Sequence, residues 1–160
     1  MSPWLHTGQL LKYANLQLSI EMAVLLSSDQ LLFIIAHARS TYPEECCGFL
    51  IGSNSDHIIV RRILATRNIA QPSRLRRYSI EPQELIRADD EARRTNLELL
   101  GVYHSHPDAP VAPSRIDLEY AWPKFTYLVL SLQGGEPYDV GAWSLNCSGT
   151  GFEPDELEVF

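Results

Sequence analysis

The stretch Gly101–Ala121, GVYHSHPDAPVAPSRIDLEYA, sets two histidines and an aspartate in a pattern that suits a metal ion. The residues before His104 predict a β-strand, in which side chains two positions apart point to the same side. His104 and His106 therefore converge on one point while Ser105 faces away. Asp117, eleven residues after His106, supplies a carboxylate. Two imidazole nitrogens and one carboxylate oxygen suit zinc, and three protein ligands leave a fourth position open for water, as catalytic zinc sites do.

Three prolines follow the second histidine, at positions 107, 110 and 113. Because proline lacks an amide hydrogen and fixes its own φ, neither a helix nor a central strand is compatible with this density. We therefore expect a stiff loop that leads away from the metal. Ser114 then begins a predicted helix that runs to Ala121.

Ser114 and Asp117 also match a capping box, in which a serine is followed three residues later by an acid and then by an apolar run. Taken alone, this motif indicates a helix cap more often than a metal site. The neighbouring pair of histidines favours the metal interpretation for Asp117. Ser114 can serve both as the cap and as a hydrogen-bond donor beside the metal.

The pattern His-Ser-His-Pro followed by Ser-x-x-Asp, with ten residues between the second histidine and the aspartate, resembles the JAMM metallopeptidases, also called MPN or Mov34 proteins. Their signature adds an upstream glutamate at the start of a strand that reads Glu-x-x-Gly-x-x-x-Gly. In the segment Tyr42–Gly52, Glu45 is the matching position and Glu44 is the neighbouring alternative. The resemblance covers residues 24–160 and implies a catalytic member, because all five signature positions are present: Glu45, His104, His106, Ser114 and Asp117.

The resemblance implies zinc-dependent hydrolysis of a peptide or isopeptide bond after the C-terminal Gly-Gly of a ubiquitin-like protein. In this interpretation zinc lowers the pKa of its bound water and polarises the scissile carbonyl. Glu45 takes the proton from that water and returns it to the leaving amine, while Ser114 helps to hold the oxyanion. The implied zinc ligands are His104, His106 and Asp117.

The chain has no room for the long insertions of the eukaryotic deubiquitinating members and is similar to the compact prokaryotic type. Some of those resemble an enzyme that removes cysteine from a sulfur-carrier protein of the ubiquitin-like fold, and the segment Arg77–Pro82 is similar to that subgroup. A slim Gly-Gly tail needs a narrow groove, where an extended peptide can add to a sheet edge. We expect residues 68–77 to form one wall, with four candidate substrate-binding residues: Asn68, Arg74, Arg76 and Arg77.

Two other functions remain open. A non-catalytic MPN-type scaffold would bind partners through its surface, although a scaffold needs neither Glu45 nor an open metal position. A zinc deaminase also combines zinc with a glutamate, but such sites prefer cysteine ligands in a Pro-Cys-x-x-Cys motif, which the chain lacks.

Length and composition predict one globular domain. The 160 residues are 45% hydrophobic and 21% charged, and their net charge of −7 argues against general nucleic-acid binding. Six of the thirteen basic residues nevertheless lie between positions 61 and 80, where no acid occurs. This cluster is either a solvated strand edge and loop or a docking patch for an acidic partner or a carboxylate. It consists of Arg61, Arg62, Arg67, Arg74, Arg76 and Arg77.

The three cysteines, Cys46, Cys47 and Cys147, form no disulfide framework, and we expect the adjacent pair to be small core residues in a reducing cytoplasm. No apolar run is long enough to cross a membrane, and the N-terminal stretch lacks the basic segment of a signal peptide. We expect residues 1–22 to be an extension of a metallopeptidase domain over residues 23–160. Homodimerisation is left open.

The predicted elements alternate between strands and helices, which favours an α/β (α+β) fold with a curved mixed sheet sandwiched by helices. The resemblance implies the same cytidine-deaminase-like architecture and places the strand of Glu45 beside the metal-bearing strand. We expect Trp122 and Trp143 to be core residues, although both are candidates for the wall of a groove. The predicted strands cover residues 24–26, 46–51, 57–66, 78–80, 97–104, 125–132, 140–146 and 157–160, and the predicted helices cover residues 28–39, 82–95 and 114–121.

Overall fold

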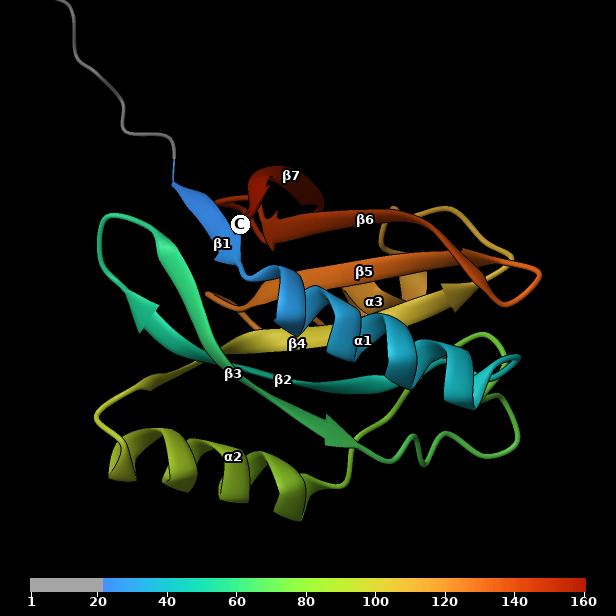
Figure 1. Cartoon of the computed structure of the whole chain (residues 1–160), viewed down its shortest axis with the longest axis horizontal. Coiled ribbons are helices and arrows are strands. Elements are labelled where there is room, and N and C mark those ends of the chain that lie inside the picture. Colours follow the sequence, from blue (N-terminus) through green and yellow to red (C-terminus); the bar gives the residue numbers. More distant parts are fainter. Residues whose placement is uncertain (1–21) are drawn as a thin grey trace, which may run out of the picture.

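The computed structural model describes residues 22–160, so the predicted extension over residues 1–22 lies almost wholly outside the described part (Figure 1). The elements follow one another in the order β1 (Ala23–Leu26), α1 (Ser28–Thr41), β2 (Cys47–Asn54), β3 (Ile58–Thr66), α2 (Pro82–Arg94), β4 (Glu98–Pro107), α3 (Arg115–Glu119), β5 (Thr126–Gln133), β6 (Glu136–Leu145) and β7 (Phe152–Val159). None of the helices among residues 22–160 is long and apolar enough to cross a membrane.

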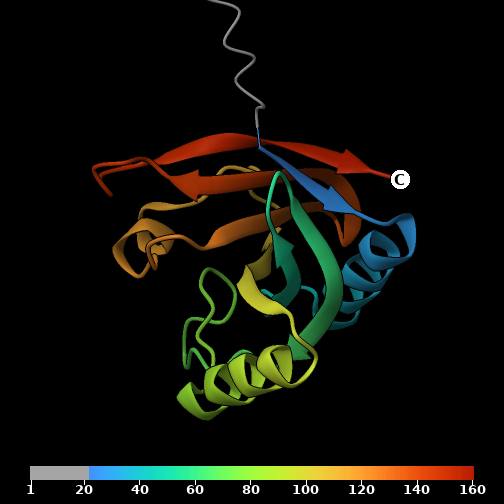
Figure 2. The same cartoon turned by 90° about the vertical axis from the view of Figure 1, so that its left-hand side faces the viewer.

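The strands form one curved mixed sheet that closes on itself, in the order β1-β3-β2-β4-β5-β6-β7. Strand β4 lies in its centre, antiparallel to β2 and parallel to β5. The last strand, β7, returns to pair in parallel with β1, and Figure 2 shows these two strands side by side at one edge of the molecule. The predicted mixed, curved sheet is confirmed, and the pairing of β1 with β7 adds its closure.

Two helices cover opposite faces of the central strands. Helix α1 packs Ile34 and Ala38 into one apolar cluster, and α2 packs Ala88 and Ala92 into another. Because adjacent residues of a strand point to opposite faces, neighbours on β4 divide between the two clusters. Tyr103 belongs to the cluster of α1 and Val102 to that of α2. His104 and His106 therefore lie on the α2 face.

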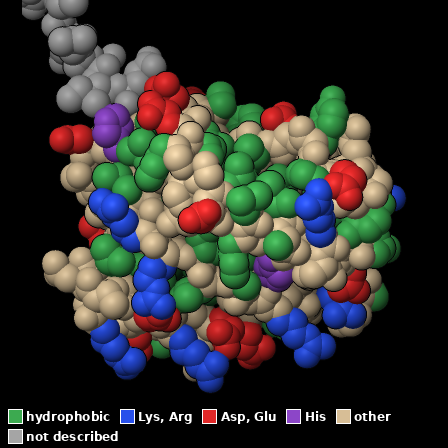
Figure 3. Space-filling view, in the orientation of Figure 1, with side chains coloured by type: hydrophobic (Ala, Val, Ile, Leu, Met, Phe, Trp, Pro, Cys, Tyr) green, Lys and Arg blue, Asp and Glu red, His purple; other side chains and the backbone are tan. Residues whose placement is uncertain are grey.

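The face that carries α1 is shown in space-filling form in Figure 3. Hydrophobic side chains gather over the middle of this face, and most of the Lys and Arg side chains lie along its lower side, next to α2. Arg62, Arg87 and Arg93 at this side are each paired with an acid of α2. Much of the basic character here is therefore balanced by neighbouring carboxylates.

The first helix begins as its sequence predicts. Ser27 accepts a hydrogen bond from the Gln30 amide at 3.2 Å, and the Gln30 side chain accepts one from the Ser27 amide at 2.9 Å. This reciprocal capping box satisfies two of the amides that a helix N-terminus leaves free. The helix continues to Thr41, two residues beyond the predicted end, and stops before Pro43, which disfavours helical geometry at Tyr42.

Two glycines of the Glu-x-x-Gly-x-x-x-Gly segment allow β3 to approach β2 closely. A Cβ atom at Gly48 would lie 2.2 Å from the carbonyl oxygen of Leu64, and one at Gly52 would lie 1.9 Å from that of Ile59. No side chain fits against main-chain atoms at these distances. The spacing of the two glycines thus reflects the pairing of β2 with β3.

One predicted strand is wrong and several bounds move. Residues 78–80 join no sheet, because the Ser79 carbonyl bonds the Ile69 amide and the Ser79 amide bonds the side chain of Asn68. Strand β4 continues through His106 to Pro107, and β2 continues three residues past its predicted end to Asn54, because Gly52, Ser53 and Asn54 also pair with β3. Strands β6 and β7 begin earlier than predicted, and α3 ends at Glu119.

Candidate metal centre

Three buried side chains from two elements converge on one point. His104 and His106 come from the C-terminal end of β4, and Asp117 comes from the first turn of α3. The Nε2 atoms of the two histidines are 3.0 Å apart. His104 Nε2 lies 3.4 Å from Asp117 Oδ1, and His106 Nε2 lies 3.5 Å from Asp117 Oδ2. One ligand atom from each residue lies within 4.8 Å of the others. This is the convergence that the sequence predicts.

The capping box of α3 fixes the position of Asp117. The Asp117 amide donates to Ser114 Oγ at 3.1 Å, and the Ser114 amide donates to the Asp117 carboxylate at 2.5 Å. The two interpretations of this motif are therefore compatible, because the cap itself holds the carboxylate beside the histidines. Ser114 Oγ acts as an acceptor in the cap, so its own hydroxyl hydrogen is free to donate.

The loop after β4 orients His106. The Nδ1 atom of His106 lies 2.6 Å from the carbonyl oxygen of Pro110. A carbonyl accepts only, so this contact places the ring hydrogen on Nδ1 and leaves Nε2 free to bind a metal. The loop is anchored in turn, because Ser131 Oγ donates to the Ala109 carbonyl at 2.6 Å and the Asp108 side chain accepts from Tyr42 and Gly134.

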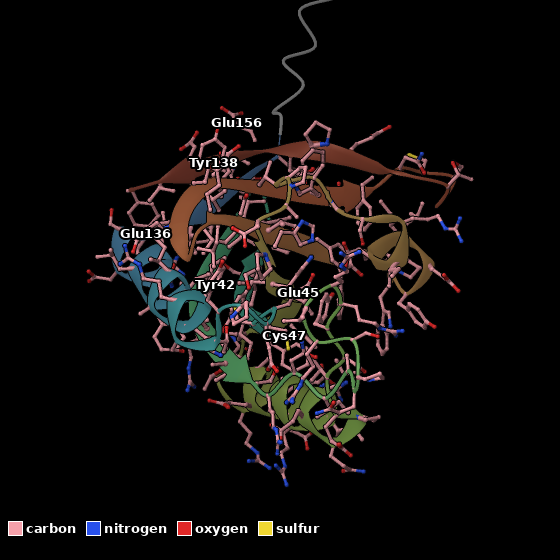
Figure 4. All side chains as sticks on the ribbon, turned by 90° about the vertical axis from the view of Figure 1, so that its right-hand side faces the viewer. Tyr42, Glu45, Cys47, Glu136, Tyr138 and Glu156 are labelled. Atoms are coloured by element: carbon pink, nitrogen blue, oxygen red, sulfur yellow. The ribbon has the colours of Figure 1, made fainter. Side chains whose placement is uncertain are left out.

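Glu45 lies beside this group because β2 pairs with β4. Cys47 is paired with His104 in the sheet, and the Cys46 amide donates to Ser105 Oγ at 2.8 Å. Glu45 is buried, and its Oε2 atom has no hydrogen-bond partner among residues 22–160. In Figure 4 it lies in the interior, between α2 and the C-terminal strands. The adjacency that the resemblance implies is therefore present.

Glu44 occupies a different environment from Glu45. Its carboxylate forms a partly exposed ion pair with Arg74 at 3.3 Å. An acid in an existing ion pair at the surface is a poorer partner for a buried metal centre than an unpaired buried one. The structure thus favours Glu45 of the two alternatives.

Burial and neighbouring charges shift the titration of the site. Burial raises the pKa of Glu45 to about 8, with opposing contributions from His106, which lowers it, and Asp117, which raises it. Burial also lowers the pKa of His104, which favours the neutral imidazole that a metal requires. For Asp117, burial opposes ionisation, but hydrogen bonds with both histidines and with Ser114 hold its pKa well below the usual range.

The candidate substrate-binding residues do not form one surface. Asn68 is buried, and its amide donates to the carbonyls of Glu45 and Arg77 and accepts from the amides of Ala70 and Ser79. Its side chain thus holds the loop over residues 68–79 together. Arg74 bonds to the Glu45 amide through its carbonyl, and Arg76 is exposed.

Arg77, the fourth candidate, contacts the segment that follows α3. Its guanidinium lies over the ring of Tyr120, 5.5 Å from the centroid, and its Nε atom is buried without a hydrogen-bond partner in the described chain. Arg77 is one of the residues that line an apolar pocket of about 320 Å³, whose wall also includes Asp117. The pocket lies between residues 77–85 on one side and residues 116–127 on the other.

Trp122 belongs to this pocket, so its prediction as a core residue is wrong. It is 52% exposed, because α3 ends at Glu119 and the chain then turns over the pocket. Trp143 is partly buried in the cluster of α2, as expected of a core residue. Trp122 thus follows the other interpretation of the sequence, in which it lines a groove. The pocket residue Tyr120 was missed by sequence reasoning, and its only signal is its place beside Trp122 directly after α3.

A family model described as prokaryotic homologs of the JAB domain matches residues 27–146. The chain belongs to this family. A desampylase of Haloferax volcanii is 33% identical over 114 residues, which cover 68% of this chain and 81% of the relative. A CysO-cysteine peptidase of Mycobacterium tuberculosis is 27% identical over 123 residues, covering 76% of this chain and 82% of the relative.

Solved structures of the same architecture exist. A protein of Desulfitobacterium hafniense is 30% identical and superposes with a TM-score of 0.74. The superposition covers 87% of this chain and 93% of the other. A JAB1/MPN domain protein from Archaeoglobus fulgidus has a TM-score of 0.54 at 18% identity, covering 87% of this chain and 96% of the other. The JAB/MPN fold expected from the signature residues is therefore confirmed.

Proposed function

We propose that this JAB-domain protein is a zinc-dependent peptidase that cleaves a peptide or isopeptide bond after the C-terminal Gly-Gly of a ubiquitin-like protein. The observation that carries the proposal is the convergence of buried His104, His106 and Asp117, with the unpaired carboxyl group of Glu45 beside them. Relatives named desampylase and CysO-cysteine peptidase support both the reaction and the class of substrate.

The three converging side chains fit zinc. Two imidazole nitrogens and one carboxylate oxygen are a common catalytic donor set, and all three residues are buried. A bound zinc ion would supply a water of lowered pKa and would polarise the scissile carbonyl. The hydrogen bond from His106 to Pro110 holds one ligand in the correct tautomer.

Glu45 is the proton carrier of the proposed reaction. It takes a proton from the attacking water and later gives it to the leaving amine, which departs as a neutral amine. A buried carboxyl group whose pKa is raised to about 8 suits both steps near neutral pH. Ser114 donates its free hydroxyl hydrogen to the oxyanion that develops at the scissile carbonyl.

The segment 78–80 is suited to hold an extended tail. The Ser79 amide donates to the side chain of Asn68, and the Ser79 carbonyl accepts from the Ile69 amide. The backbone groups of Tyr78 and Ile80 bond to none of the described residues. The proposed substrate tail runs along this free edge toward the metal centre.

Hydrolysis of a defined substrate tests the proposal. A ubiquitin-like sulfur carrier bearing an amide-linked group after its Gly-Gly is incubated with zinc-loaded protein, with chelator, and with the variants Glu45→Gln and Glu44→Gln. Mass spectrometry should show cleavage after Gly-Gly that chelator and Glu45→Gln abolish and Glu44→Gln leaves intact.

Two results would contradict the proposal. An active Glu45→Gln enzyme with an inactive Glu44→Gln enzyme would assign the proton transfer to the other acid. A folded, zinc-loaded protein that binds the carrier without cleaving any Gly-Gly substrate would favour the scaffold function instead. A cytoplasmic location, consistent with the three free cysteines, stays a prediction of the sequence, and homodimerisation stays open.

A further inference from the structure

We propose that Tyr78 is a positioning residue of the metal centre, whose ring holds the imidazole of His104 in the orientation that binds zinc. Through Tyr78, the order of the loop over residues 68–79 is coupled to metal binding. This inference rests on the metal centre of the proposed function, and it concerns binding of the metal rather than the hydrolytic step.

The two histidines of the centre are held in different ways. His106 is oriented by the hydrogen bond from its Nδ1 atom to the Pro110 carbonyl. The Nδ1 atom of His104 is buried and has no hydrogen-bond partner among residues 22–160. A metal-bound histidine almost always donates its second ring nitrogen to an acceptor, which fixes the orientation of the ring. Packing must therefore do for His104 what a hydrogen bond does for His106.

An aromatic ring supplies this packing. The centroids of the Tyr78 and His104 rings are 4.6 Å apart, and their planes are inclined by 30°. This distance lies within the range of favourable aromatic pairs. Tyr78 also packs against the apolar cluster of α2, on the face of β4 from which His104 points. The ring restricts rotation of the imidazole and keeps its Nε2 atom beside that of His106, 3.0 Å away.

A single side chain holds the backbone on both sides of Tyr78. Asn68 donates through Nδ2 to the Arg77 carbonyl at 3.0 Å, and its Oδ1 atom accepts from the Ser79 amide at 3.1 Å. The same Nδ2 group donates to the carbonyl of Glu45 at 3.0 Å. Buried Asn68 thus ties the segment that carries Tyr78 to the residue proposed as the proton carrier. The loop is therefore a support of the metal centre.

Thermodynamic linkage makes this support reciprocal. When docking of the loop, with Tyr78 against His104, raises zinc affinity by a given factor, zinc binding favours the docked loop by the same factor. We expect both effects, and each is measurable without any substrate.

Zinc affinity tests the role of the ring. Competition with a chromophoric chelator is measured for the wild type, Tyr78→Leu and Tyr78→Phe. Tyr78→Leu should bind zinc about tenfold more weakly, as variants of residues that orient ligands do, whereas Tyr78→Phe keeps the ring and should bind like the wild type. Tyr138→Leu is the matched control, because Tyr138 is an exposed tyrosine on β6 that lies away from Glu45 in Figure 4. Wild-type affinity in Tyr78→Leu, or an equal loss in Tyr78→Phe, would overturn the proposal.

The imidazole signals of the metal-free protein separate positioning from a general loss of stability. In Tyr78→Leu, the nitrogen NMR signals of His104 should broaden as its ring exchanges between orientations, and Tyr78→Phe should restore them. His106 keeps its hydrogen bond to Pro110, so the hydrogen on its Nδ1 atom should stay in every variant. Sharp, wild-type His104 signals in Tyr78→Leu would overturn the proposal.

Amide hydrogen exchange tests the reverse direction in the unaltered protein. Saturating zinc should slow exchange over residues 68–79 by about tenfold in the wild type, the factor expected for zinc affinity, and by much less in Tyr78→Leu. Equal exchange of this loop with and without zinc in the wild type would overturn the coupling.

These measurements separate the inference from the peptidase function, because none of them uses a substrate. Zinc affinity that depends on the Tyr78 ring, in a protein that cleaves no Gly-Gly substrate, would sustain the inference and overturn the peptidase function. Chelator-sensitive cleavage after Gly-Gly, with equal zinc affinity in the wild type and Tyr78→Leu, would do the reverse.

Discussion

The Nδ1 atom of His106 lies 2.6 Å from the carbonyl oxygen of Pro110, in the loop that follows β4. The residue before Pro110 is held by Ser131, whose hydroxyl donates to the Ala109 carbonyl at 2.6 Å. Ser131 is also the partner of His106 in the pairing of β4 with β5. One strand neighbour therefore positions the carbonyl that selects the tautomer of a proposed metal ligand.

Removal of the Ser131 hydroxyl should weaken metal binding without removing a ligand. We expect Ser131→Ala to lower zinc affinity by about tenfold, the lower end of the range for residues that orient ligands. Competition with a chromophoric chelator measures this affinity, and nitrogen NMR of the metal-free protein reports whether the hydrogen stays on Nδ1 of His106. Ser144→Ala removes a strand hydroxyl elsewhere, bonded to Asp155, and should leave both readouts unchanged. An unaltered affinity in Ser131→Ala would show that the loop keeps its position without this bond.

The buried amide of Asn68 should be essential to the order of the loop over residues 68–79. Asn68→Ala leaves the amides of Ala70 and Ser79 and the carbonyls of Glu45 and Arg77 without a partner, so we expect a loss of about 2–3 kcal/mol in the free energy of unfolding. Trypsin should then cut after the arginines of this loop while the rest of the domain stays intact. Asn54→Ala, at an exposed position, is the control. Equal trypsin resistance of both variants would show that other contacts hold the loop.

Local sequence features predicted the metal centre better than they predicted its surroundings. The convergence of His104 and His106 follows from strand alternation, and the position of Asp117 follows from a capping box that spans three residues. Both depend on neighbours in the chain. The adjacency of Glu45 depends on pairing with a strand about sixty residues away, and only the family resemblance supplied it.

Most of the missed features depend on contacts between residues that are well separated in the sequence. Residues 78–80 have the composition of a strand, but their nearest hydrogen-bonding partners are the side chain of Asn68 and the backbone of Ile69, not a neighbouring strand. The exposure of Trp122 follows from the early end of α3, and the contact of Arg77 with Tyr120 joins two loops. The closing pair of β1 and β7 likewise joins the two ends of the described chain. Propensity and periodicity carry no signal for such contacts.

The glycine at position 48 should tolerate no side chain. A Cβ atom there meets the main chain of β3 at Leu64 and the ring of Tyr103, so Gly48→Ala must displace a strand. We expect a loss of about 2–4 kcal/mol, larger than ordinary overpacking because main-chain atoms are involved. Denaturant unfolding of the chelator-treated protein measures it. Gly151→Ala, where the added atom makes only an ordinary contact with Asn146, should change stability little. Similar unfolding midpoints for the two variants would contradict the close approach of β2 and β3.

The buried carboxyl group of Glu45 should make the stability of the metal-free protein depend on pH. Burial raises its pKa in the folded state to about 8, above the ordinary value of 4.5 for a glutamate in water. The folded protein then binds more protons than the unfolded chain between these values, so stability falls as pH rises through that interval and becomes level above it. Below the lower value, both states are protonated and the group has no effect.

Replacement of Glu45 by glutamine removes the titrating group. The difference in stability between the wild type and the variant therefore reports the titration of Glu45 alone. Relative to the wild type, Glu45→Gln should gain stability progressively from about pH 5 to pH 8, reaching a difference on the order of a few kcal/mol. Thermal unfolding with chelator present, across this pH series, measures the difference. Glu44→Gln is the matched control, because it makes the same substitution at the neighbouring acid, whose carboxylate is partly exposed and paired with Arg74. Parallel pH profiles for the wild type and Glu45→Gln would mean that Glu45 titrates as an exposed acid, and its buried position beside the histidines would be wrong.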